Sequence, residues 1–162
     1  MKRDVSLKIT SAQYVETLEP SGEAFSRKLE LEDSVEVLTT GTMYNKENAL
    51  YVTYDESKEL ASEDVKTVLK LTTNDSGKKV FTIRRYGQSD DEDMDMILQQ
   101  GIRNITRYKI PQVGSLDIEV YTVSLTDEFD EDGYGKICVD YRLKFDQFYS
   151  RRNKLEVEIK PQ

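Results

Sequence analysis

Strict alternation of apolar and polar residues is the feature that most constrains how this chain folds. It is plainest between Gly101 and Leu125, where two alternating runs flank Pro111 and Gly114. Successive side chains of a strand point to opposite faces, so a repeat of two residues predicts strands with one apolar face. Proline and glycine suit the turn between such strands, because a turn needs no ladder hydrogen bonds. The stretch therefore predicts a long β-hairpin.

The same alternation recurs along most of the chain. It occupies residues 5–9, 28–37, 50–54, 65–71, 81–85, 137–145 and 155–159, with polar turns at 45–48 and 74–77. Within 28–37 the apolar residues fall at odd positions, which predicts one half-buried strand face that carries Leu29, Leu31, Val35 and Val37. A turn at Asp33 and Ser34 would divide that strand in two. A polar loop is predicted at 147–153.

Residues 90–100 are the place where a helix competes with a strand. Ser89 and Glu92 have the spacing of a capping box, and Gly101 stands where a helix would end. The neighbouring segments are all predicted strands, which favours a strand here. Both interpretations stay open from the sequence.

The whole pattern predicts an all-β protein with little helix. The 162 residues contain no internal repeat and are enough to bury one core, so residues 1–162 are expected to form a single domain. About eight to ten strands in consecutive hairpins form an antiparallel meander, and such a sheet must protect its edge strands. We therefore expect the meander to close into a β-barrel.

Charge and cysteine content argue against several classes of partner. The formal net charge of -8 and the sequence pI of about 4.7 repel phosphate backbones and anionic lipids, so neither nucleic acid nor a membrane is expected as a partner. No apolar run approaches the ~18 residues of a membrane helix. A single cysteine, Cys138, excludes an intramolecular disulfide framework and favours a reducing, cytoplasmic location.

The residues that usually carry catalysis or bind metals are scarce. The chain contains no histidine, which removes the commonest general base and metal ligand. Cys138, flanked by Lys136 and Asp140 on its strand face, is interpreted as an ordinary surface thiol. Of two acidic stretches, 89–95 and 127–133, the second resembles the start of a calcium loop, but Val139 stands where the closing carboxylate is required. We expect no enzyme activity, no metal and no cofactor.

Several segments together resemble a known family. They are GTMYNKENALYVTYDES from Gly41, the triplet Arg85, Tyr86 and Gly87, MILQQGIRNITRY from Met96, and IPQVGSLDIEVYT from Ile110. In this order, over nearly the whole chain, they resemble the YwiB-like family, small bacterial proteins of unknown function. The resemblance implies a calycin-like, or lipocalin-like, β-barrel. It supplies no catalytic residue, although barrels of this type often hold apolar ligands.

The expected barrel has polar side chains among the apolar residues of its lumen. Apolar walls with a few polar groups are the composition of a ligand pocket, and equally of a filled barrel whose polar groups satisfy each other. Alternation and the tyrosine-rich strands give six candidate ligand-binding residues: Arg85, Asn104, Thr106, Tyr108, Tyr141 and Tyr54.

Three functions remain open. The preferred one is a cytoplasmic protein that binds a small, partly apolar ligand in the barrel lumen. The alternative is a structural or protein-interaction module that self-associates as a homodimer, through a strand edge or an apolar outer patch at Tyr121 and Val123. An enzyme built on carboxylates or tyrosines ranks last, because nothing in the sequence assembles a base with a nucleophile.

Overall fold

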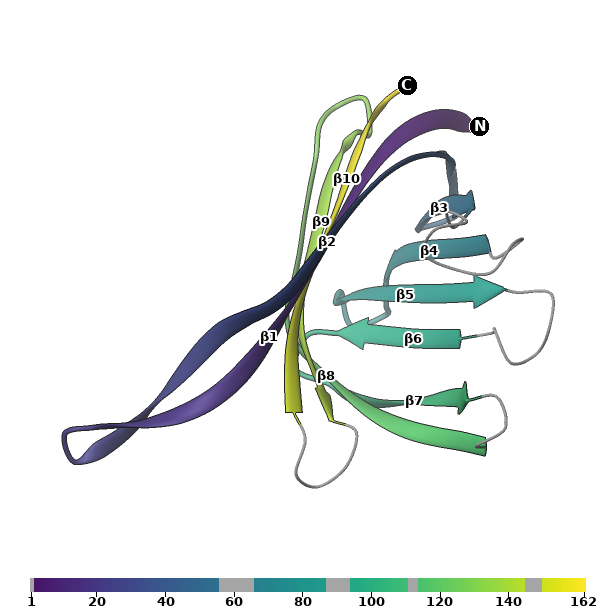
Figure 1. Ribbon diagram of the computed structural model, residues 1–162. Helices are drawn as coiled ribbons and strands as arrows, with labels where there is room; N and C mark the ends of the chain where they lie inside the picture. The colour runs from purple at the N-terminus through teal and green to yellow at the C-terminus, as the bar shows by residue number, and fades with distance from the viewer. Residues whose placement is uncertain (1, 56–65, 87–93, 111–113, 145–149) are drawn as a thin grey trace.

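The computed structural model describes residues 2–55, 66–86, 94–110, 114–144 and 150–162 (Figure 1). These residues form ten β-strands in one antiparallel sheet, so the all-β prediction is confirmed. The strands are β1 (Arg3–Ser21), β2 (Ala24–Lys46), β3 (Ala49–Asp55), β4 (Lys66–Thr73), β5 (Lys79–Tyr86), β6 (Met94–Gln99), β7 (Arg103–Ile110), β8 (Gly114–Phe129), β9 (Gly135–Lys144) and β10 (Ser150–Pro161). The described residues contain no helix long and apolar enough to cross a membrane.

Three local predictions can be compared with the strands. The segment in which helix and strand competed forms β6 from Met94 to Gln99, while 89–93 lie outside the described residues. The predicted hairpin is confirmed, since Ile110 pairs with Gly114, although 111–113 lie outside the described residues. The loop predicted at 147–153 is wrong from Ser150 onward, because β10 begins there and pairs with β9.

The C-terminal strand lies in the middle of the sheet. The strand order is β6-β5-β4-β3-β2-β1-β10-β9-β8-β7, so β10 joins the first strand to the ninth. On the inner face Ile159 stands opposite Leu7, and Val157 stands opposite Ile9. All four side chains are buried. Matching apolar faces near the two ends of the chain therefore hold the sheet together.

The sheet bends so that β3 to β6 lie across from β1, β10 and β9 (Figure 1). The apolar faces of the strands pack into one cluster inside this bend. Its buried members are Val5, Leu7, Ile9, Met43, Val52, Leu69, Leu71, Phe81, Met96, Leu98, Ile118, Val120, Leu125, Ile137, Val139, Tyr141, Val157 and Ile159. Each fully buried aliphatic side chain contributes about 1.5–3 kcal/mol, so this cluster is the main source of stability.

The sheet is not closed, which corrects the prediction of a complete barrel. Its end strands, β6 and β7, share no backbone ladder among the described residues. The side-chain amide of Asn104 instead donates to the Ile97 carbonyl at 3.2 Å. The backbone N–H of Gly101 donates to the Thr122 carbonyl of β8 at 2.8 Å, and the Thr122 N–H donates to the Ile102 carbonyl at 3.4 Å. These backbone bonds hold residues 101–102, just before β7, against β8.

The outer half of the β1–β2 hairpin projects from the body of the protein (Figure 1). β1 pairs with β10 only as far as Val15, and β2 pairs with β3 only from Gly41 onward. We name residues 16–31 the arm. Gly22 forms its tip at a φ of 64°, a left-handed conformation that glycine adopts without steric cost.

The prediction of one half-buried face over residues 28–37 is wrong. β2 runs through Asp33 without a turn, but its register with β1 shifts beside Gln13. One extra residue turns every following side chain to the opposite face. Val35 therefore shares the inner face with the core, whereas Leu31 lies on the outer face and is 60% exposed.

Candidate functional site

A row of four polar side chains crosses the inner face of the sheet. Gln13 of β1 stands opposite Asn153 of β10, which stands opposite Tyr141 of β9. Tyr141 in turn stands opposite Thr122 of β8. Residues paired in antiparallel register point to the same face, here the face that carries the core. We name Gln13, Asn153, Tyr141 and Thr122 the polar row.

Both ends of the polar row coincide with an irregularity in the sheet. The register between β1 and β2 shifts after Gln13, and the register between β8 and β9 shifts after Thr122. A β-bulge increases the local twist and re-aims side chains, and bulges are frequent next to functional sites. The row therefore lies where the sheet departs most from regular geometry.

Two atoms of the polar row are buried without a hydrogen-bond partner among the described residues. They are the Thr122 hydroxyl oxygen and the Asn153 amide nitrogen. Thr122 is 0% exposed and Asn153 is 7% exposed. An unpaired buried polar group costs about 1–3 kcal/mol. A bound molecule with complementary polar groups would gain most at these two positions, which stand two strands or roughly 10 Å apart.

Two of the predicted ligand-binding residues lie in one row on the other half of the sheet, on either side of Thr67. Tyr54 of β3 and Arg85 of β5 are both paired with Thr67 of β4, on the inner face. Gly41 of β2 completes this second row, because a Cβ there would lie 3.3 Å from the Cβ of Tyr54 and 2.5 Å from a backbone oxygen. The second row is therefore closely packed at Tyr54.

The other four predicted residues lie on β7 and β9. Tyr141 belongs to the polar row and is 8% exposed. Thr106 is 2% exposed, and Asn104 bridges to β6 as described above. Tyr108 also belongs to β7, but its side chain lies outside the described residues. Strand register thus places Tyr54 and Arg85 in one row, with Thr67 between them, and Tyr141 in a separate row.

Sequence reasoning missed three members of the polar row. Thr122 lies in the alternating run that ends at Leu125 but was not singled out, and Gln13 lies beyond the run predicted for the first strand. Asn153 was assigned to a loop. Its signal was the repeat of two residues, which continues backward from Ile159 and Val157 to Asn153.

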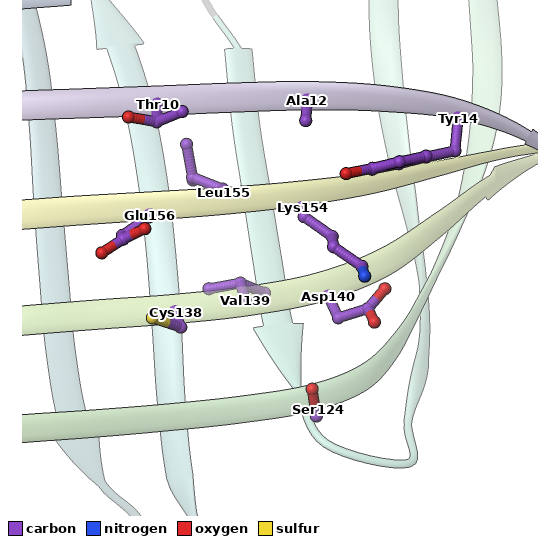
Figure 2. Close-up of a pocket in the computed structure, with 10 residues that line it drawn as sticks. All are labelled: Thr10, Ala12, Tyr14, Ser124, Cys138, Val139, Asp140, Lys154, Leu155 and Glu156. Atoms are coloured by element: carbon purple, nitrogen blue, oxygen red, sulfur yellow. The ribbon is translucent and has the colours of Figure 1, made fainter. Parts of the chain in front are cut away.

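A concave region lies on the outer face of β1, β10, β9 and β8 (Figure 2). This outer groove has a volume of about 410 Å³ and is lined by Thr10, Ala12, Tyr14, Ser124, Cys138, Asp140, Lys154 and Glu156, together with Val139 and Leu155, which alternate with them toward the inner face. The Lys154 ammonium lies 5.2 Å from the centroid of the Tyr14 ring. Two causes raise the pKa of the Cys138 thiol: burial, which is the larger, and the charge of Glu156. A raised pKa makes the thiol a poor nucleophile at neutral pH.

Arginine–carboxylate pairs hold the end of the arm that joins the body of the protein. Arg152 donates two hydrogen bonds to the Asp140 carboxylate, at 2.7 and 2.8 Å. Glu16 accepts hydrogen bonds from Arg142 at 3.1 Å and from Arg152 at 3.2 Å. The hydrogen bonds to Asp140 raise the pKa of Arg152, which therefore stays charged. Partial burial makes this network stronger than an exposed ion pair.

The acidic stretch 127–133 holds a turn together. The Asp130 carboxylate accepts hydrogen bonds from the backbone N–H groups of Asp132 at 2.9 Å and Tyr134 at 3.0 Å. The carboxylate is thereby engaged by the protein itself. Within the described ranges there is no group of three side chains suited to hold a metal ion. Most of the other acidic stretch, 89–93, lies outside these ranges.

Fold and site together define a small all-β protein whose bent antiparallel sheet carries polar rows on its inner face. The chain belongs to the family described as "Domain of unknown function (DUF1934)", whose profile matches residues 24–157. It is also similar to the crystal structure of ywiB protein from Bacillus subtilis, with 22% identity, a TM-score of 0.65, and coverage of 98% of this chain and 93% of that one. The resemblance to the YwiB-like family is confirmed, and the structural likeness shows the fold. The comparison with curated proteins found no match.

Proposed function

We propose that the protein binds a small, partly apolar molecule inside the bend of its sheet, with the polar row as the contact for the ligand's polar groups. One observation carries the proposal: the Thr122 hydroxyl and the Asn153 amide are buried without hydrogen-bond partners among the described residues. A ligand that offers hydrogen-bonding groups to both atoms would offset their desolvation.

The surroundings of the polar row suggest the class of ligand. Its four members are uncharged, which favours a neutral ligand over an ion. Val120, Val139 and Val157 lie on the same inner face and are at most 2% exposed, so the rest of the ligand would meet apolar side chains. Apolar walls with a few placed polar groups are typical of small-molecule sites. We also propose that the bent sheet encloses a calycin-like lumen, with the Asn104 side chain linking β7 to β6 where the sheet is not closed.

The proposed role is non-catalytic and cytoplasmic. It is supported by the absence of histidine and by the single cysteine in the sequence. The proposal requires no metal or cofactor. The net charge of -8 supports a neutral small molecule over nucleic acid or an anionic membrane as the partner.

Native mass spectrometry of the purified protein tests the proposal. We expect a mass excess that disappears on denaturation, and we expect Asn153→Leu and Thr122→Val each to abolish it. Both replacements remove an unpaired polar atom and nearly preserve side-chain shape. The ligand-free variants should therefore be as stable as the parent, or more stable by about 1 kcal/mol in urea unfolding.

Thr67→Val is the matched control, because Thr67 is equally buried, at 1% exposure, and interacts with other groups of the protein. It should lose about 1 kcal/mol of stability and keep the ligand. A bare native mass, together with a fragment screen that leaves the NMR signals of the polar row unchanged, would rule the proposal out. Destabilisation by Thr122→Val would also count against it, since the hydroxyl would then be paired within the protein.

A further inference from the structure

The arm has one apolar face and one polar face. Residues paired between β1 and β2 share a face, and the pairs Tyr14–Leu31, Glu16–Leu29, Leu18–Arg27 and Pro20–Phe25 define the outer one. The opposite face carries Thr17, Glu19, Ser26, Lys28 and Glu30. There Lys28 forms ion pairs with Glu19 at 3.5 Å and with Glu30 at 3.6 Å. The arm is thus an amphipathic hairpin, with the pattern of a sheet whose outer face packs against another surface.

The apolar face of the arm is exposed. Leu18 is 67% exposed, Phe25 73% and Leu31 60%. A two-stranded hairpin is marginally stable alone in water, and contiguous exposed apolar side chains mark interaction sites. The patch predicted at Tyr121 is a weaker candidate, because that ring is partly buried and lies 5.3 Å from the Arg103 guanidinium. The arm is therefore the surface to explain.

The order of residues along the outer face of β2 is self-complementary. From the body to the tip it runs Leu38, Glu36, Ser34, Leu31, Leu29, Arg27 and Phe25. In a two-fold pair of antiparallel arms with the axis beside Leu31, the tip of one arm meets the root of the other. Arg27 then faces the partner's Glu36, and Phe25 faces the partner's Leu38. Glu36 is available for this contact, since its pair with Lys8 is long, at 3.9 Å, and half exposed.

The same two-fold relation brings Leu18 of β1 to the partner's Thr10, at the edge of the outer groove. An apolar side chain at the tip thus meets a hollow of about 410 Å³ on the other copy. The paired stretch, from Phe25 to Leu38, is about 45 Å long and about 10 Å wide. Two copies would bury on the order of 900 Å², which suits a reversible dimer at the low end of specific interfaces.

We propose that two copies of this chain form a two-fold dimer in which the apolar face of each arm packs antiparallel on residues 31–38 of the partner's β2, with Arg27 of each copy against the partner's Glu36. Charge disfavours an anionic membrane as the occupant of this face, because the arm has four acidic and two basic residues. The proposal is independent of ligand binding on the inner face.

Sedimentation equilibrium of the full chain over a range of concentrations tests the dimer. We expect a monomer–dimer equilibrium whose Kd rises at least about tenfold in Phe25→Ser and in Leu31→Ser, because each change removes apolar area from both copies. Ile105→Ser is the matched control: Ile105 is 65% exposed on β7, away from the arm, and its replacement should leave Kd unchanged. Circular dichroism checks that each variant is folded.

A charge swap tests the antiparallel arrangement. Arg27→Glu alone and Glu36→Arg alone should each weaken the dimer, and the double variant should restore it, because opposite charges then face each other again. A monomer at every concentration, or a dimer that the arm variants leave intact, would overturn the proposal. A dimer that the arm variants weaken but the double charge swap does not restore would overturn the pairing of Arg27 with Glu36.

Discussion

The surroundings of Cys138 on the outer face lower the reactivity of its thiol. Burial raises the pKa of the thiol, and the nearby Glu156 carboxylate raises it further. The thiolate is the reactive form, so a raised pKa lowers the rate of alkylation at neutral pH. We expect iodoacetamide to modify Cys138 more slowly than free cysteine at neutral pH, with a rate that keeps increasing as the pH rises past the ordinary thiol pKa.

Glu156→Gln isolates the electrostatic part of this effect. Removing the carboxylate lowers the pKa of Cys138, so the thiolate fraction and the alkylation rate at a fixed pH should both increase. Glu158→Gln is the control, because Glu158 lies two positions farther along the same face of β10 and is paired with Lys136, whereas Glu156 is paired with Cys138 itself. Identical alkylation rates for the parent and Glu156→Gln, measured by mass spectrometry, would contradict the assignment.

At the scale of the strands, Glu16 ties the β1–β2 hairpin to β9 and β10 through Arg142 and Arg152. Arg152→Lys keeps the positive charge but loses the two-pronged hydrogen bonding to Asp140 and the contact with Glu16. For a partly buried pair we expect a loss of about 1–2 kcal/mol in the free energy of unfolding, measured by urea denaturation.

Lys28→Ala is the comparison for Arg152→Lys. Lys28 also forms two ion pairs, but its side chain is 51% exposed, so its removal should cost less than about 0.5 kcal/mol. Equal losses in the two variants would mean that the network at the inner end of the arm is no stronger than a surface ion pair.

The same hairpin marks the limit of what alternation predicts. The repeat of two residues identified β9 and most of β8 correctly, because it reports which side chains share a face. It failed between Gln13 and Leu31, since one extra residue in β2 inverts the pattern and leaves no compositional mark. Asn153 was missed because a polar residue at an inward position looks like loop sequence. The polar row thus lies where local pattern and strand register diverge.

Across the whole molecule, the faces of the strands could be predicted but their partners could not. Nothing in the alternation of β10 distinguishes an edge strand from the central position that it occupies between β1 and β9. The closure of the barrel was inferred from the need to protect edges. The structure meets that need differently, with β6 and β7 joined by the Asn104 side chain in place of a backbone ladder. Long-range pairing is thus the part of the fold that local sequence leaves open.

The central position of β10 leads to a prediction about folding. A variant that ends at residue 149 would leave β1 and β9 without their shared partner and would remove Val157 and Ile159 from the core. We expect it to show no cooperative thermal transition by circular dichroism. A synthetic peptide of residues 150–162 should restore the transition, because strand addition returns both the backbone hydrogen bonds and the buried side chains.

The arm provides the control, because shortening it also removes residues from two strands but does not touch the core. Replacing residues 18–27 with Asn-Gly joins Thr17 to Lys28, a pair already in register, through a two-residue hairpin turn. This variant should keep a cooperative transition. If the chain without β10 unfolded as cooperatively as the shortened-arm variant, the first and last strands would not be what unites the two halves of the sheet.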